Sequence, residues 1–326
     1  FQATIPDVLP DERDYTKALS LSRLAYDMES LISPILAAGL LTLINFHWLF
    51  SGTMIGFIAS ALLVVTTVLP RAPKQQTAGQ GVYSKTTGGV RFYLRTPRLR
   101  GLLALTLASA AASSMVIVNT VVIVRDKLGL GQQEVALTLA AFGAGSILAA
   151  FTLPRILDRV SDRVIMLMSG AMLAWLLAIM AVVTYWIGGH SSYWYALLAG
   201  WFAMGIAYLM SVTPSGRLLK RSAKAEDRPA LFAAQFALSH GCWLICYPLA
   251  GQLGAGGDQI LAFVVLSVLA HAGVIGARFL WPAEDPDILA HSHPDLPPEH
   301  PHMREDHRTS DGHVFVVDDL HPRWPQ

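Results

Sequence analysis

The feature that most constrains this chain is a repeated series of apolar runs long enough to cross a lipid bilayer. About eight runs approach or exceed the ~18 residues that a span requires, and they exclude Lys and Arg except near an end. Because lipid offers no hydrogen-bond partner, each run must pair its own backbone groups as a helix. The sequence therefore predicts an all-α membrane protein. The predicted spans are residues 19–43, 47–69, 101–124, 135–154, 164–187, 193–214, 230–251 and 259–281.

The composition agrees with this fold class and argues against several functions. Charged residues make up only 14% of the 326 residues, against about 25% in soluble domains. The net charge of +1 averages basic loops with an acidic tail, so it does not predict nucleic-acid binding. The two cysteines, Cys242 and Cys246, lie in one apolar run and imply no disulfide framework. No phosphate-binding loop, nucleophile elbow or His-Glu-x-x-His motif predicts an enzyme, and no cofactor is predicted.

Lysine and arginine alternate from loop to loop, which predicts the orientation. The start of the chain and the segments 70–100, 155–163 and 216–228 are rich in both residues, whereas the loops between them hold little beyond Arg125 and Lys127. We therefore predict a multi-pass protein of the bacterial inner membrane with both chain ends in the cytoplasm.

The predicted helices divide unevenly into domains. Residues 1–69 hold two helices, 70–100 form a basic cytoplasmic linker, 101–281 form a six-helix half-bundle and 282–326 form a His-rich acidic tail. A two-plus-six arrangement, in a chain that opens with Phe1 on a loop-like stretch, is expected if four helices are missing from the front of a six-plus-six transporter.

Two motifs carry a resemblance to a known family. Residues 154–163 read Pro-Arg-Ile-Leu-Asp-Arg-Val-Ser-Asp-Arg, and residues 33–39 read Ser-Pro-Ile-Leu-Ala-Ala-Gly. The first resembles the G-x-L-x-D-R-x-G-R-R loop of the major facilitator superfamily without its glycines. The second is similar to the Gly-Pro-x-x-Gly-Gly-like element of its antiporters. The resemblance covers residues 1 to about 281 and implies a helix bundle holding the last eight of twelve helices.

The 154–163 loop is a candidate gate. An ion pair between Asp158 and Arg159, where the two half-bundles meet, would be a bistable contact suited to alternating access. Asp162 and Arg163 complete this predicted gating loop. The alternative is a basic cytoplasmic loop with incidental acidic residues.

Ionisable residues within a span are functional-site hypotheses because they are costly to bury. Asp27 and Glu29 are candidates for proton coupling or cation binding. Alternatively, Arg23 and Asp27 form an i,i+4 pair near the surface and Glu29 extends toward water.

The seventh span has a broad polar face that we predict to line the transport cavity. At helical spacing, a polar stripe lies beside a mainly aromatic one. Imidazole and thiolate bind late divalent metals, whereas buried cysteine is also a common small apolar residue. The polar stripe contains Gln235, Ser239, Cys242 and Cys246, and the second stripe contains Phe236, His240, Trp243 and Tyr247.

The tail holds seven of the eleven histidines among prolines and acidic residues. Such a His-rich tract predicts metal binding, and Ni²⁺ or Cu²⁺ would bind better than Co²⁺. The alternative is a disordered acidic tail. The predicted ligands are His291, His293, His300, His302, His307, His313 and His321.

The tail, the stretch 22–27 and the helix from Ala233 to Pro248 resemble the nickel-resistance permeases of the superfamily. That resemblance implies proton-coupled export of Ni²⁺ with some Co²⁺, with lipid, protons and the metal as partners. Two alternatives remain open. One is an exporter of a drug-like or siderophore-like molecule, for which Trp175, Trp201, Trp243 and Tyr247 would provide an aromatic lining. The other is a non-transporting, metal-responsive membrane protein.

Overall fold

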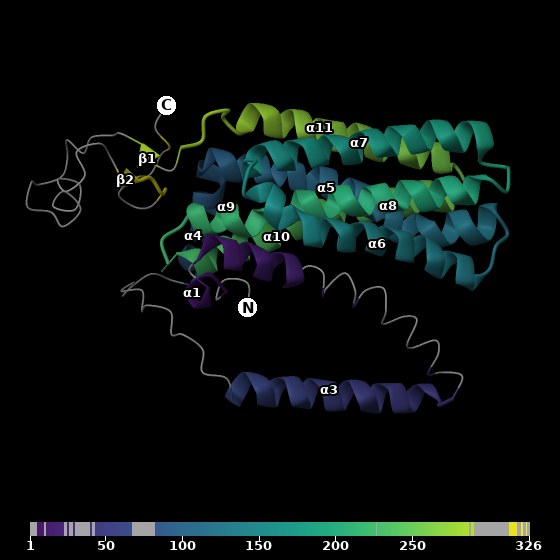
Figure 1. The fold of residues 1–326 in the computed structure, drawn as a ribbon, viewed down its shortest axis with the longest axis horizontal. Coiled ribbons are helices and arrows are strands. Elements are labelled where there is room, and N and C mark those ends of the chain that lie inside the picture. Colours follow the sequence, from purple (N-terminus) through teal and green to yellow (C-terminus); the bar gives the residue numbers. More distant parts are fainter. Residues whose placement is uncertain are drawn as a thin grey trace, which may run out of the picture.

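The architecture is that of a long helical bundle (Figure 1). The structure, a computed structural model, describes residues 5–9, 11–22, 25, 29, 40, 43–66, 82–225, 227–286, 288–289, 313–317, 321 and 324. The helices are α1 (Ile5–Val8), α3 (Phe46–Thr66), α4 (Val82–Arg95), α5 (Pro97–Val121), α6 (Gln132–Leu157), α7 (Asp162–Ile187), α8 (Tyr193–Val212), α9 (Ser215–Arg221), α10 (Arg228–Ala255) and α11 (Gln259–Leu280). A π-helical turn η1 (Val122–Lys127) extends α5, and two short strands, β1 (Ile288–Leu289) and β2 (His313–Val314), follow the bundle.

The predicted all-α membrane fold is confirmed. In the described residues, seven helices are long and apolar enough to span a membrane. They correspond to seven of the predicted spans, whereas the predicted span 19–43 lies largely outside the described residues. The 70–100 linker is more structured than its glycines suggested, because it contains α4 and the start of α5.

Local chemistry explains where several helices begin. Thr96 is extended because a residue before proline avoids the helical region, and Pro97 occupies the first turn of α5, where no amide partner is needed. The carboxylate of Asp258 accepts the Leu261 amide at 2.9 Å and so caps α11. The Glu134 carboxylate accepts the Gly131 amide at 2.9 Å at the start of α6.

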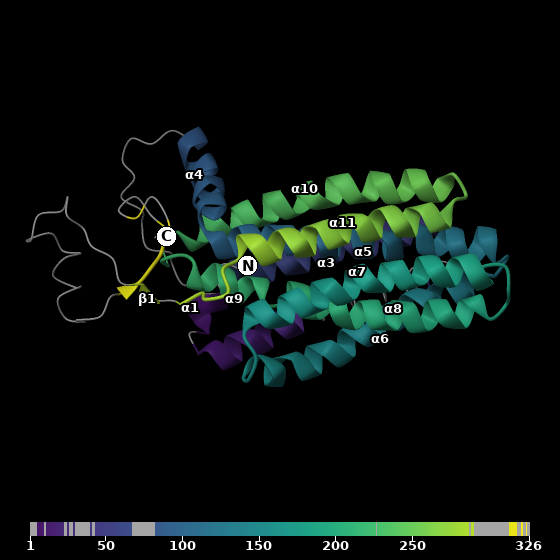
Figure 2. The ribbon, with the colours of Figure 1, turned by 90° about the horizontal axis from the view of Figure 1, so that it is seen from above.

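The six long helices from α5 to α11 pack into one unit, seen from above in Figure 2. Helix α5 contacts both α10 and α11, α11 also packs on α7, and α6 packs along α8. The α6–α8 crossing requires glycine. A Cβ atom at Gly145 would overlap the Phe202 carbonyl oxygen, and one at Gly205 would overlap that of Phe142. Small residues therefore allow the two backbones to approach closely.

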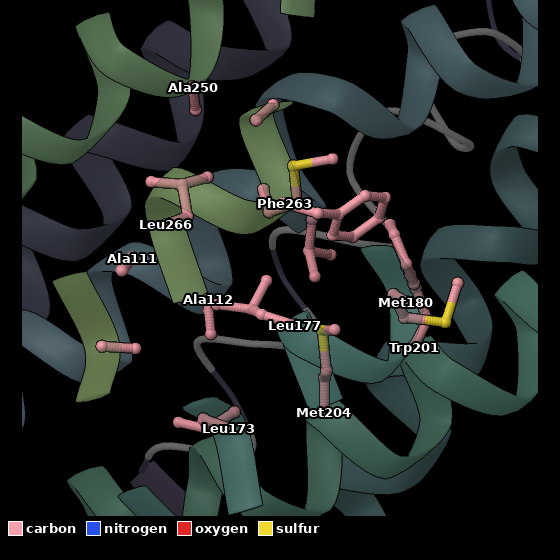
Figure 3. Packing of buried hydrophobic residues seen from close by; sticks show 14 of the residues in the cluster. Ala111, Ala112, Leu173, Leu177, Met180, Trp201, Met204, Ala250, Phe263 and Leu266 are labelled. Carbon is pink, nitrogen blue, oxygen red and sulfur yellow. The ribbon is translucent and has the colours of Figure 1, made fainter. Parts of the chain in front are cut away.

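The core of this unit lies among α5, α7, α8, α10 and α11, where Trp201, Phe263 and Met204 are buried with alanine and leucine side chains (Figure 3). Several polar side chains of the core find partners inside the protein, which offsets the cost of taking them out of water. The Trp201 indole donates to Thr120 Oγ1 at 2.8 Å, and the hydroxyls of Ser109 and Ser211 are 2.9 Å apart.

Helix α3 differs from the other long helices because all its described side chains except that of Leu49 are exposed. Large apolar side chains such as Trp48, Phe57 and Leu63 project from it. A helix that is apolar all round is stable only in lipid or against another apolar surface.

Candidate functional site

Charged side chains concentrate at one end of the bundle. Here α5 begins, α6 turns into α7 at residues 158–161, α9 is followed by residues 222–227, and α11 ends (Figure 1). We call this region the basic end. The 155–163 and 216–228 segments, which the sequence predicted to share one side of the membrane, both lie here.

A buried carboxylate organises the centre of the basic end. Asp162, the first residue of α7, is 3.0 Å from Arg217 Nε and 3.4 Å from Arg221 Nη1. Its side chain is only 2% exposed, so the ion pairs are largely shielded from water and salt. The position at a helix N-terminus also favours a negative charge. Asp162 therefore joins α7 to α9 by charge.

Arg217 extends this network to the N-terminal part of the chain. Glu12 Oε1 lies 2.8 Å from Arg217 Nη2, and Arg217 Nη1 donates to Thr16 Oγ1 at 2.9 Å. Both partners belong to the helical stretch 12–22. Arg217 therefore holds that stretch against the six-helix unit.

Apolar packing reinforces this contact. Tyr15 and Leu19 are buried against α9, where a Cβ at Gly216 would lie 2.7 Å from Leu19 Cδ1 and 2.9 Å from the Tyr15 hydroxyl. The Lys220 ammonium sits 4.7 Å from the Tyr15 ring centroid, a cation–π geometry. Burial raises the pKa of Tyr15 above its ordinary value. Since Tyr15 stays neutral, it adds no charge to the network.

The predicted gating loop lies within this network, but its internal pairing differs from the prediction. Asp158 Oδ2 pairs with Arg13 Nη2 at 3.0 Å rather than with its neighbour Arg159. Adjacent residues at the end of a helix point in different directions, which leaves Asp158 free to reach the 12–22 stretch. Arg163 donates to the Trp281 carbonyl oxygen from Nε at 3.2 Å and from Nη2 at 3.0 Å, and so attaches α7 to the end of α11.

A second carboxylate, Asp285, connects the end of α11 to the network. It lies 3.1 Å from Arg98 Nε and 3.3 Å from Arg221 Nη2, and its Oδ2 accepts the Trp281 indole N–H at 3.0 Å. The first residues of the tail are therefore fixed to α5 and α9 at the basic end.

The predicted polar face of α10 is divided between two environments. Cys242 and Cys246 are buried in the core rather than lining an open surface. Gln235 Oε1 accepts the Tyr93 hydroxyl of α4, and the Ser239 hydroxyl donates to the Phe236 carbonyl at 2.8 Å. The long Gln side chain reaches the linker helix, whereas the thiols fit the small spaces beside α5.

The neighbouring stripe of α10 is the more open one. Phe236, His240 and Tyr247 are exposed, and Trp243 is partly buried. The His240 ring lies 4.0 Å from that of Phe236, and its Nδ1 is 2.7 Å from the Phe236 carbonyl oxygen. This aromatic stripe is the more exposed face of α10. Trp201, predicted to line the cavity, is buried in the core because its indole hydrogen-bonds across to α5.

No three His, Cys, Asp or Glu side chains come close enough to hold a metal ion in the part of the chain that the structure describes. Asp27 and the predicted tail ligands His291, His293, His300, His302 and His307 lie outside that part. Glu29 is helical and exposed, His313 lies in β2, and His321 is buried with its ring 5.0 Å from that of Phe315.

Several residues of the network were not singled out in the sequence. Arg217 and Arg221 counted only toward the orientation, although their i,i+4 spacing places both on one face of a helix. Glu12 and Asp285 gave no local signal, because their partners are distant in sequence.

The model of the Major Facilitator Superfamily matches residues 1–168 and 102–301 of the chain. The search of curated proteins found no match to the chain. Together the two matches cover most of the sequence, and they agree with the helical bundle and its long apolar spans. The chain therefore belongs to the major facilitator superfamily, and it is a multi-pass secondary transporter of the lipid bilayer.

Proposed function

We propose that the protein exports divalent nickel, and also cobalt, in exchange for protons. The supporting observation is that the histidine-rich tail leaves the bundle at the basic end, where Asp285 is held by Arg98 and Arg221. An exporter gains from metal ligands on the side from which it loads its substrate. The imidazoles of the tail match the donor preference of late divalent ions.

In this proposal the basic end faces the bacterial cytoplasm, and so do both chain ends. The Lys and Arg residues of the loops support this orientation. The tail would then raise the local concentration of metal beside the cytoplasmic entrance.

The ion pairs of the basic end supply a gate for alternating access. Arg13–Asp158 and Glu12–Arg217 connect the N-terminal helical stretch to the six-helix unit, whereas Asp162–Arg217 lies within that unit. Exposed pairs contribute little to stability and exchange readily with water. The outer pairs would therefore break when the halves separate, and the buried pair would persist.

Proton coupling needs a carboxylate that changes its protonation during the cycle. We assign this role to Asp27 and Glu29, with Gln235, Ser239 and His240 forming part of the substrate path. Cys242 and Cys246, being buried, would help to shape the path rather than bind metal directly.

A second candidate is export of an apolar or aromatic organic molecule. The observation that favours it is the aromatic stripe of α10, where partly buried Trp243 and exposed Tyr247 have ring centroids 5.0 Å apart. Such a surface stacks on planar molecules better than it binds a metal ion. A non-transporting, metal-responsive protein is the third alternative.

Everted membrane vesicles with an imposed proton gradient separate these candidates. We expect radioactive nickel to accumulate, and to leak out when the gradient is collapsed. Changing the four histidines at 291, 293, 300 and 302 to asparagine should raise the KM for nickel with little change in kcat. A matched control changes tail acids such as Glu299 and Glu305 to glutamine and keeps the histidines. Transport of a dye but not of nickel would support the organic substrate, and transport of neither would support the third alternative.

A further inference from the structure

The chain returns to the basic end after the histidine-rich part of the tail. Strands β1 and β2 pair antiparallel, with Ile288 opposite Val314 and Leu289 opposite His313. The three residues that follow, Phe315, Val316 and Val317, are buried. Their burial is unexpected for a tail rich in charge, and it indicates a specific docking site.

The docking site lies between the linker helix and the six-helix unit. Val316 and Val317 line a small cavity with residues of α4, of the 222–227 stretch and of the first turn of α10. The remaining lining residues are Gly89, Phe92, Ser222, Ala223, Asp227 and Leu231. The docked valines therefore share this cavity with both α4 and the α9–α10 junction.

An aromatic cluster forms a second anchor. The Phe315 ring lies 5.0 Å from His321 and 5.1 Å from Trp324. The Trp324 ring in turn lies 5.0 Å from the guanidinium carbon of Arg98, at the start of α5. Because Arg98 is buried and also pairs with Asp285, the cluster is tied to the same network that fixes the beginning of the tail.

We propose that residues 313–317, together with His321 and Trp324, form a latch that clamps the linker helix α4 onto the six-helix unit, and that a divalent cation bound by His321 releases it. His321 is only 4% exposed in the docked state. A divalent ion held by a histidine takes several further protein ligands, and in the described residues no three metal-ligating side chains come together around docked His321. Binding of an ion by His321 together with other tail ligands therefore requires the segment to leave its docked position.

A docked latch would restrain the motion of the N-terminal helices relative to the six-helix unit. Helix α4 belongs to the linker between them, so a docked latch restrains their relative motion from the basic end. A ligand that binds only the undocked segment shifts the equilibrium toward release. Metal bound by the tail would thus free the linker when substrate is present. This coupling rests on the proposed nickel function, whereas the latch itself does not.

Cysteine accessibility tests the latch in the intact protein in nanodiscs, where both membrane faces are open to reagent. In Val317→Cys the thiol is buried if the latch is docked, and in Ala283→Cys it is exposed. We expect a hydrophilic maleimide to label Val317→Cys at least about tenfold more slowly. Adding Phe315→Ala removes a buried ring from the cluster and should raise that rate about tenfold. The protein without an introduced cysteine is the control for labelling of its two native cysteines, Cys242 and Cys246. Equal labelling of the two cysteines without metal would refute the latch.

Nickel supplies the second arm of the experiment. Saturating NiCl₂ should raise the labelling of Val317→Cys about tenfold and leave that of Ala283→Cys unchanged. The matched control is His321→Phe in the Val317→Cys background, which retains an aromatic ring beside Phe315 but cannot bind metal. Its labelling should stay slow with nickel. Faster labelling with nickel in the control that carries His321→Phe, or unchanged labelling with nickel in Val317→Cys alone, would refute the role of His321. Vesicle transport is a separate measurement, so failure of nickel export is distinguishable from failure of the latch.

Discussion

Replacing Asp162 with asparagine tests whether the buried ion pairs stabilise the basic end. The substitution removes the charge that faces Arg217 at 3.0 Å and Arg221 at 3.4 Å. Removing one partner of a buried pair costs about 3–5 kcal/mol because the other charge stays buried. Arg217 keeps Glu12 at 2.8 Å and Arg221 keeps Asp285 at 3.3 Å. We therefore expect a loss at the lower end of that range, about 3 kcal/mol.

The assay is the apparent Tm of the purified protein in detergent, followed by tryptophan fluorescence or by loss of the monodisperse peak. With an unfolding entropy of about 2.1 cal/mol/K per residue, 1 kcal/mol corresponds to about 1.5 °C for a chain of 326 residues, so Asp162→Asn should lower the Tm by about 4 °C. The matched control is Asp158→Asn. Asp158 is 37% exposed and its partner Arg13 is 67% exposed, and pairs so open to water contribute little.

We expect Asp158→Asn to melt within about 2 °C of the parent protein. The double variant Asp162→Asn with Arg217→Gln should recover part of the loss, because it removes the uncompensated charge together with its partner. Equal Tm values for the two single variants would show that burial does not set the strength of these pairs, and would refute the reasoning.

Three further predictions concern packing and titration. Gly205→Ala should lower the stability by about 1–3 kcal/mol in detergent melts, because its new methyl group overlaps α6 backbone; Gly241→Ala, with open space around its Cβ, should not. Burial raises the pKa of Tyr93 well above its ordinary value. The stability that the neutral Tyr93 side chain contributes is therefore fully present below about pH 10 and is lost as the pH rises further. Tyr93→Phe should therefore show a shallower fall in Tm above pH 10, and at neutral pH it should cost about 1 kcal/mol through the lost bond to Gln235. Trp201→Phe should cost a similar ~1 kcal/mol in the same melts, because it leaves a threonine hydroxyl of α5 without its indole donor; an unchanged Tm would contradict this.

The helices of the bundle follow from local properties of the chain. Predicted spans such as 164–187 and 193–214 match α7 (Asp162–Ile187) and α8 (Tyr193–Val212) within about two residues, because length and hydropathy are enough to specify a helix in lipid. The Pro97 start of α5 was also readable, since proline acts on its own neighbours.

The candidate site depended on contacts that local patterns do not report. Asp158 was predicted to pair with the adjacent Arg159, and its partner Arg13 is 145 residues away. The stripe of Gln235 to Cys246 was expected to share one environment, but α4 and α5 pack against different parts of it. Spacing along a helix determines which side chains share a face, and the neighbouring helices determine what that face meets.

The sequence by itself determined that this chain crosses a membrane as a helical bundle with its arginine-rich turns grouped together, because lipid penalises every unpaired backbone group and every exposed charge in each segment separately. Only the tertiary structure decided which carboxylate meets which arginine, and that the end of a charged tail is buried against α4. Those outcomes arise from shape and charge complementarity between segments far apart in the chain, and no short stretch of sequence contains that information.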